Sequence, residues 1–164
     1  MKTDSEFTQA LKGSERAVRV VASWFRSLGR EVRVPSLKIR PDFKDRLEYV
    51  DSGDLFILKE EGEKRVEIKH RNLAFKSAKD YPYSTVFVDE KHKVDRLPLK
   101  DLAGYITINK DFSSVCCIQS GSKKHWKTKR KFDKKDDQVC EFYECPVEYC
   151  QFFQLKREYS NETR

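Results

Sequence analysis

The stretch DLFILKEEGEKRVEIK, residues 54–69, predicts two short strands joined by a charged turn. A compact apolar run at residues 55–58 gives way to polar residues, with Gly62 at the bend. Residues 65–70 then resume an alternating pattern of polar and apolar side chains. A short apolar run before a glycine-containing turn and an alternating segment after it are typical of a β-hairpin.

Strand geometry then decides which side chains of this hairpin lie together. Successive side chains of a strand point to opposite faces, so Val66 and Ile68 share one face while Glu67 and Lys69 share the other. Asp54 immediately precedes the neighbouring strand. Two acids that can share a hard cation, beside a lysine, are the components of a metal-assisted phosphodiester site.

These residues resemble the motif of the PD-(D/E)XK nuclease superfamily, which includes restriction-type enzymes, resolvases and recombination nucleases. Asp54 supplies the first acid and Glu67-Ile68-Lys69 the E-x-K element, and the resemblance covers roughly the first half of the chain. It implies an α/β fold of the restriction-endonuclease-like kind, with a central mixed β-sheet flanked by helices. The alternative is a solvated hairpin with its charges on an outer face.

The resemblance also implies a cofactor and roles for the motif residues. The cofactor would be Mg²⁺ or Mn²⁺, held by the Asp54 and Glu67 carboxylates and by the backbone carbonyl of Ile68. Lys69 would orient the nucleophilic water and neutralise charge on the phosphate.

The N-terminal segment is expected to form a helix from about Thr3 to Leu28, stopped by Gly29. Glu15 falls on or beside its apolar stripe, and a buried carboxylate needs a partner or a metal. In the resembled superfamily an acid of the first helix often completes the metal site, so Glu15 is a further candidate for catalysis and metal binding. The alternative is that Glu15 lies at the edge of the stripe and pairs with Arg19.

Other acids compete with Asp54 for the metal. Pro41-Asp42 matches the superfamily name literally, but charged residues follow it where the pattern requires an apolar strand. Asp51 is better explained by the turn that it begins. His70 follows the E-x-K element and points to the face opposite Lys69, where packing is the more frequent role.

The 164 residues are expected to form one domain, with a nuclease-like core at about 3–119 and a basic, aromatic, β-rich C-terminal part at about 120–155. Further strands are predicted at residues 31–35, 84–88, 105–109 and 114–119, the last two as a hairpin. No stretch has the length of a membrane span, and the charged N-terminus lacks the apolar core of a signal peptide. A cytoplasmic protein with no membrane partner is therefore expected.

The formal net charge of +7 favours a polyanionic partner. Residues 121–136 contain eight Lys or Arg against two Asp, in an alternation that predicts a basic strand. We interpret this run as a surface that follows a phosphate backbone, without base-specific readout. The alternative is a merely solvated face. The candidate contacts to nucleic acid are Lys123, Lys124, Lys127, Lys129, Arg130 and Lys131.

Residues 139–153, VCEFYECPVEYCQFF, predict an aromatic-rich strand whose proline favours a sheet edge or a strand end. Cys140, Cys145 and Cys150 recur every five residues, and Cys116 and Cys117 lie upstream. Buried free thiols acting as small apolar residues are the expected reading. A zinc or iron–sulfur site and a redox role are the alternatives.

The function predicted from these observations is a small Mg²⁺-dependent DNA nuclease that hydrolyses phosphodiester bonds, as an endonuclease or an exonuclease. DNA is the expected partner, and a homodimer is compatible with the sequence. One alternative is a non-catalytic nucleic-acid-binding protein that retains the nuclease fold. Another is a zinc-stabilised interaction module built on the late cysteines.

Overall fold

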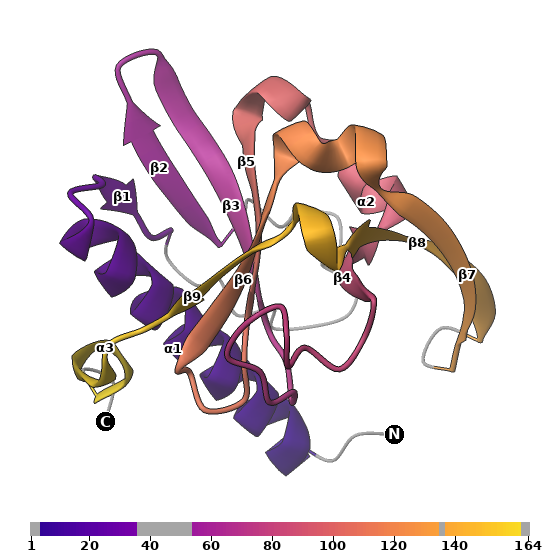
Figure 1. Ribbon diagram of the computed structural model, residues 1–164, viewed down its shortest axis with the longest axis horizontal. Helices are drawn as coiled ribbons and strands as arrows, with labels where there is room; N and C mark the ends of the chain where they lie inside the picture. The colour runs from indigo at the N-terminus through magenta and orange to yellow at the C-terminus, as the bar shows by residue number, and fades with distance from the viewer. Residues whose placement is uncertain (1–3, 36–53, 135–136, 162–164) are drawn as a thin grey trace.

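The computed structural model describes residues 4–35, 54–134 and 137–161, which form three layers (Figure 1). Helix α1 covers one face of a six-stranded sheet, and a three-stranded sheet packs on the other face. The elements in chain order are α1 (Asp4–Ser27), β1 (Val32–Arg33), β2 (Leu55–Lys59), β3 (Gly62–His70), β4 (Thr85–Glu90), α2 (Lys91–Asp95), the 3-10 helix η2 (Leu99–Asp101), β5 (Leu102–Ile108), β6 (Ser114–Gln119), η3 (Ser120–His125), β7 (Lys127–Asp133), β8 (Gln138–Pro146), η4 (Val147–Tyr149), β9 (Gln151–Gln154) and α3 (Arg157–Asn161).

Helix α1 confirms the predicted N-terminal helix, and it ends just before Gly29, whose φ is 77°. Its inward side chains, among them Val20, Val21 and Trp24, are buried against the six-stranded sheet. The helix continues through Gly13, and the missing side chain of this glycine leaves room for the His70 ring. A Cβ there would lie 3.0 Å from Nδ1 of His70, at the end of β3. No helix in the described ranges is long and apolar enough to cross a membrane.

The predicted hairpin at residues 54–69 is confirmed as the antiparallel pair β2 and β3, with Leu55 opposite Val66 and Ile57 opposite Lys64. Gly62 closes the turn with a φ of 128°, in the region that favours glycine. Residues 105–109 and 114–119 likewise pair as the hairpin of β5 and β6.

The six-stranded sheet has the order β1-β2-β3-β5-β6-β9. All its neighbours run antiparallel except β3 and β5, which are parallel. The α/β class and the mixed sheet are therefore as predicted. The connection from β3 to β5 leaves this sheet and contributes β4 to the second one.

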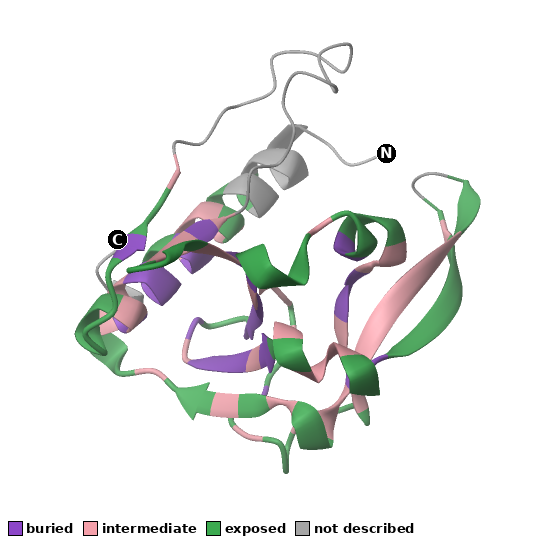
Figure 2. Ribbon diagram, turned by 90° about the horizontal axis from the view of Figure 1, so that it is seen from above, coloured by how far each residue is buried: buried purple, intermediate pink, exposed green. Residues whose placement is uncertain are grey.

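The sheet has its expected helix, α1, on one face, and in the described residues a second sheet rather than further helices covers the other face. The face opposite α1 is covered by the three-stranded sheet β4-β8-β7, whose inward residues Val86, Val88 and Cys145 join Tyr105 and Ile118 in a second buried cluster. Buried residues of β4 and of the end of β8, rather than a helical stripe, supply the cover. Strands β7 and β8 extend beyond this contact as an arm, in which β7 is exposed along most of its length and β8 is mostly half-buried (Figure 2).

Residues 139–153 do not form one strand. Strand β8 ends at Pro146, η4 turns the chain, and β9 then pairs with β6 in the other sheet. Proline has no N–H to continue a ladder, so it stands at the strand end, as one of the two readings expected. The aromatic residues before the turn therefore lie in the three-stranded sheet, and those after it lie in the six-stranded sheet.

Candidate functional site

The two faces of β3 have different environments. Val66 and Ile68 are 2% and 9% exposed and pack in the cluster beneath α1. Glu67 and Lys69 occupy the opposite face, beside Tyr105 and Thr107 of the parallel neighbour β5. The alternation predicted for this strand is confirmed, and it places both polar residues of the E-x-K element between the two sheets.

Asp54 is fixed against the edge of β3. The Ile68 N–H donates a 2.7 Å hydrogen bond to Asp54 Oδ2. The ladder between β2 and β3 ends at the pair Leu55 and Val66, so the next amide on this edge, that of Ile68, takes its acceptor from the Asp54 side chain. The N–H and C=O of one strand residue point to the same side, so the Ile68 carbonyl also faces this edge.

Glu67 is 6% exposed. Its carboxylate accepts a hydrogen bond from Nε of Arg65, and the two side chains form an ion pair. Arg65 lies two residues earlier on the same face of β3. A buried carboxylate is strongly destabilising without a counter-charge, and Arg65 provides one. Asp54 and Glu67 thus lie on adjoining positions at the end of the β2–β3 ladder.

Lys69 contacts an acid that the sequence interpretation did not single out. Its Nζ lies 3.2 Å from Oδ2 of Asp89, which is 9% exposed at the end of β4 in the other sheet. The other Asp89 oxygen accepts a 2.9 Å hydrogen bond from the Glu90 N–H. The signal was present in TVFVDE, residues 85–90, where an acid directly follows an apolar strand.

Tyr105 of β5 lies beside Glu67 in the parallel ladder. Its hydroxyl is buried and forms no hydrogen bond within the described residues. Burial raises the pKa of Tyr105, and the negative charges of Asp89 and Glu67 raise it further. A buried hydroxyl left in this state beside two carboxylates indicates a place where a polar ligand or water belongs.

Glu15 is half-buried on α1, the layer opposite the face that carries Glu67 and Lys69. In the described part of the chain no hydrogen bond or ion pair joins Glu15 to those two residues, to Asp54, or to Arg19. Its metal-binding role therefore stays a prediction. The rival acids Asp42 and Asp51 lie outside the described residues.

His70 is a packing residue, as expected from its face. Its ring stacks on Phe112 with 4.4 Å between ring centroids and an interplanar angle of 20°. Arg16 of α1 covers the same Phe112 ring, 4.2 Å from its centroid. Together with the close approach of Gly13, these contacts lock α1 onto the end of β3.

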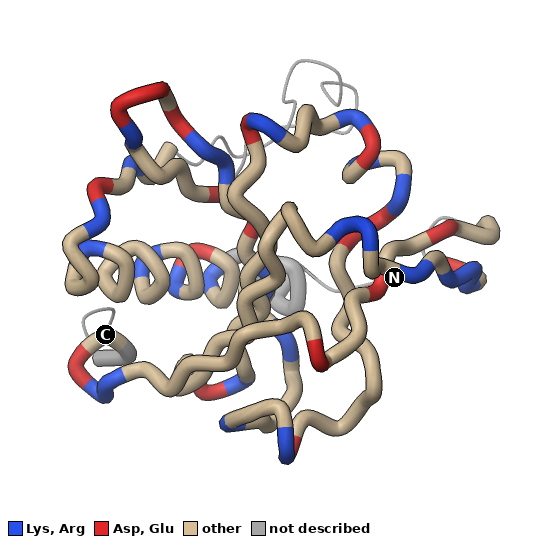
Figure 3. Tube along the Cα trace, turned by 45° about the horizontal axis from the view of Figure 1, so that its top comes forward, with Lys and Arg blue, Asp and Glu red and all other residues tan. Residues whose placement is uncertain are grey.

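The predicted basic strand is confirmed as β7, and Figure 3 shows cationic residues following the arm. Lys127, Lys129, Arg130 and Lys131 are exposed on this strand, while Lys124 is exposed on η3. Lys123 differs, because its Nζ lies 3.2 Å from Asp95 Oδ1 and 5.3 Å from the centroid of the Tyr143 ring. It holds η3 against α2 and β8.

Three thiols meet between the two sheets, although their spacing along one strand argued against pairing. At the turn after Pro146, both Cys145 and Cys150 donate to the Pro146 carbonyl oxygen, with Sγ–O distances of 3.6 and 3.5 Å, and Cys150 packs against the buried cluster that contains Cys116 and Cys145. The hydrogen bond with Cys150, followed by burial, raises the pKa of Cys145. Burial also raises the pKa of Cys117 to about 12. Thiols of this kind stay protonated and behave as apolar residues, as expected.

The carboxylate and carbonyl oxygens at the edge of β3 are the type of ligand atom that Mg²⁺ prefers. The described residues contain no group of three His, Cys, Asp or Glu side chains arranged to hold a metal ion. Mg²⁺ commonly binds through one or two carboxylates and keeps several waters, so the predicted donors Asp54, Glu67 and the Ile68 carbonyl would be enough in number. Their role as metal ligands stays a prediction.

Comparison of the chain with known protein families, curated proteins and solved structures gives no match. The interpretation of the site therefore depends on its own chemistry.

Proposed function

We propose that this protein is a metal-dependent DNA nuclease with a restriction-endonuclease-like fold, acting inside the cell where its substrate is. The observation that carries the proposal is the arrangement at one edge of β3. Asp54 is held by the Ile68 N–H, Glu67 is the adjoining buried acid, and Lys69 follows on the same face. The single long helix across a mixed sheet supports the same fold.

Each residue of this edge has a role in phosphodiester hydrolysis. When bound, Mg²⁺ polarises a phosphate oxygen and lowers the pKa of a coordinated water. Asp54, Glu67 and the Ile68 carbonyl are the groups that would hold it. The Lys69 ammonium supplies positive charge where negative charge develops on the phosphate. Asp89 orients that ammonium through its ion pair.

The alternative is a protein that binds nucleic acid without cutting it. The ion pairs of Glu67 with Arg65 and of Lys69 with Asp89 favour this alternative, because they engage the charges that catalysis needs. A nuclease must open or share these pairs when metal and substrate bind. A non-catalytic protein can keep them permanently.

Cleavage of plasmid, linear and branched DNA with Mg²⁺ or Mn²⁺, with and without chelator, separates the two. The nuclease proposal expects chelator-sensitive cleavage that Lys69→Ala abolishes. Glu67→Gln should also abolish it, but this change removes the carboxylate that pairs with half-buried Arg65, so its thermal melt must accompany the assay. Wild-type protein that is inert on every DNA form would overturn the proposal, as would full activity in Lys69→Ala.

A further inference from the structure

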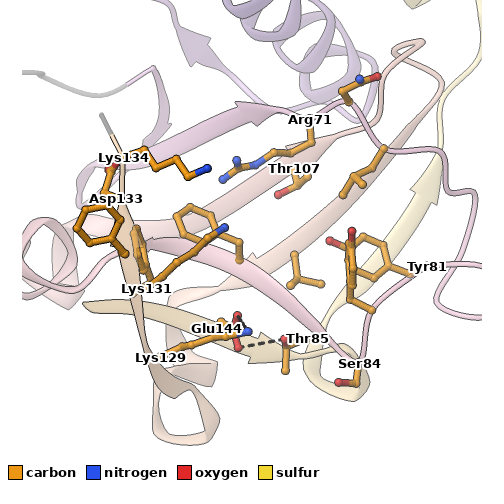
Figure 4. A pocket seen from close by; sticks show the side chains of 17 residues that line it. Arg71, Tyr81, Ser84, Thr85, Thr107, Lys129, Lys131, Asp133, Lys134 and Glu144 are labelled. Carbon is orange, nitrogen blue, oxygen red and sulfur yellow. Dashed lines mark hydrogen bonds and ion pairs between the residues drawn. The ribbon is translucent and has the colours of Figure 1, made fainter. Parts of the chain in front are cut away.

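An open groove of about 1090 Å³ lies between the arm and the end of β3 (Figure 4). One wall comes from β4, β7 and β8, and the other from Thr107 and the segment that follows β3. We call it the basic groove. Its lining residues that matter below are Arg71, Tyr81, Tyr83, Phe87, Lys129, Lys131, Phe132, Lys134 and Phe142.

The basic groove carries a net positive charge, which favours binding of an anion. Four cationic side chains line it, against Asp133 and Glu144. Glu144 is already engaged, because it accepts a 3.2 Å hydrogen bond from the Thr85 hydroxyl and lies 3.8 Å from Lys129 Nζ. Lys131 and Lys134 form no ion pair within the described residues. Four cations against two acids leave a net positive charge in the groove, which a bound polyanion would stabilise.

The cations approach one another from opposite walls. Figure 4 shows Arg71 reaching across from the end of β3 toward Lys134, with Lys131 directed into the same space. Arg71 is held in place by Phe87, whose ring centroid lies 4.5 Å from the guanidinium carbon. Burial lowers the pKa of Arg71 from its ordinary value, but a guanidinium stays charged at neutral pH. A phosphate between these side chains would contact both walls.

Aromatic rings are interleaved with these cations. Tyr83 and Phe132 are 60% and 51% exposed at the groove, which is unusual for rings of this size. Tyr81 lies beside Tyr83, with 6.2 Å between ring centroids. Cations that follow a backbone, together with aromatic rings that accept bases, are the combination found in sites for single-stranded nucleic acid.

The basic groove leads to the candidate site. Phe87 contacts Arg71 in the groove and lies 6.0 Å from Lys69 Nζ, measured to its ring centroid. Thr107 lines the groove and stands next to Lys69 in the parallel ladder. A nucleic-acid strand bound in the groove would therefore reach the face of β3 that carries Glu67 and Lys69.

We infer that the basic groove binds single-stranded DNA, so that the substrate carries an unpaired segment next to the bond to be cut. The statement about the cut bond rests on the proposed nuclease function, and the binding statement does not. Tyr83 and Phe132 can stack on a base only in an unpaired strand, because in a duplex each base already stacks on its neighbouring bases.

Binding is measured by fluorescence anisotropy in EDTA, so that no cleavage is needed. The probes are a labelled twelve-nucleotide oligothymidine and a blunt duplex of the same length. Tyr83→Ala and Phe132→Ala should each weaken oligothymidine binding at least about fivefold. Tyr149→Ala is the matched control, because Tyr149 is also exposed but stacks on His125 outside the groove.

Charge variants test the other half of the recognition. Lys131→Ala and Lys134→Ala should each reduce the slope of log affinity against log salt by about 0.7 for a single strand. Lys59→Ala, exposed at the end of β2, is the control and should leave the slope unchanged. All these side chains are exposed, so thermal melts should match that of the wild-type protein.

The outcomes separate this inference from the proposed function. Equal or tighter binding of the blunt duplex, or oligothymidine binding unaffected by the Tyr83 and Phe132 changes, would overturn the inference even if the protein cuts DNA. Protein that binds oligothymidine through these residues but cuts no DNA would support the inference and overturn the nuclease proposal. With both correct, tailed duplexes are cut faster than blunt ones, near the junction of the tail.

Discussion

The ammonium of Lys69 and the carboxylate of Asp89 lie 3.2 Å apart, and this contact joins the two sheets of the protein. Lys69 belongs to β3 of the six-stranded sheet, and Asp89 is the penultimate residue of β4 in the three-stranded one. The acid therefore fixes the position of the lysine from a different layer. A change at Asp89 should act through Lys69 rather than through the substrate.

Replacing Asp89 with Asn should lower the cleavage rate at least tenfold, because Lys69 loses its orienting charge. The same change should cost about 1.5–3 kcal/mol of unfolding free energy, the range for a hydrogen bond to a charged group. Rates under saturating substrate and urea unfolding measure the two effects. Asp89→Glu should restore part of the rate, because it restores the charge.

Glu63→Gln is a matched control for Asp89→Asn, since it breaks the exposed ion pair between Arg33 and Glu63 at 2.7 Å. Exposed ion pairs are screened by solvent, so its stability loss should be smaller and cleavage unchanged. A wild-type rate in Asp89→Asn would show that Lys69 needs no positioning partner.

Asp54 allows its charge to be separated from its hydrogen bond. Asp54→Asn keeps an oxygen that can accept from the Ile68 N–H, whereas Asp54→Ala leaves that amide without this acceptor. Both changes should abolish metal-dependent cleavage, but only Ala should reduce stability, by about 1.5 kcal/mol. Cleavage assays beside thermal melts test this. Retained cleavage in Asp54→Asn would contradict a metal-binding role.

Gly104 should be irreplaceable for the fold. A Cβ at this residue of β5 would lie 2.1 Å from the backbone oxygen of Ile118 on β6. Because neither strand can move without breaking the ladder, Gly104→Ala should destabilise the protein by about 3 kcal/mol. Gly121→Ala, with nothing within 4 Å of its Cβ, is the control and should change stability by under about 0.5 kcal/mol. Equal melting temperatures would contradict the tight β5–β6 approach.

Asp95 makes stability depend on acid pH. It accepts hydrogen bonds from Lys91 at 2.6 Å, from the Tyr143 hydroxyl at 2.8 Å and from Lys123 at 3.2 Å. The bond from Lys91, followed by that from Tyr143, lowers the pKa of Asp95 to about 2. An unfolded Asp titrates near about 3.9. The stabilisation is therefore present above pH 4 and lost as the pH falls toward 2.

Asp95→Asn should remove this contribution. The difference in melting temperature between wild type and variant should be constant at neutral pH and shrink between about pH 4 and pH 2. Glu148→Gln is the control, because Glu148 is exposed and forms no ion pair in the described part of the chain. A pH-independent difference would mean that the charge of Asp95 is unimportant.

Local patterns were sufficient for the elements that carry the candidate motif. The apolar stripe and Gly29 predicted α1, and the alternation around Gly62 predicted the β2–β3 hairpin. The face of each side chain from Val66 to His70 followed from strand geometry alone. Such features depend on residues close in sequence, and one chain is enough to reveal them.

Contacts between distant residues were not accessible in the same way. Asp89 was recognisable as an acid after an apolar strand, but its pairing with Lys69 depends on how β4 leaves the first sheet. The division of residues 139–153 between two sheets, and the meeting of Cys145 and Cys150 that follows, depend on the turn after Pro146.

The helix, the hairpin and the polar face that carries Glu67 and Lys69 follow from local sequence, because periodicity and turn residues act over a few neighbouring positions. What covers that face depends on tertiary packing. Strand β4 and the end of β8, rather than a helix, pack over it because Val86, Val88 and Cys145 find a partner surface on β5 and β6. That packing brings Asp89 to Lys69 and places Arg71 opposite the cations of β7, and no single segment contains either relationship.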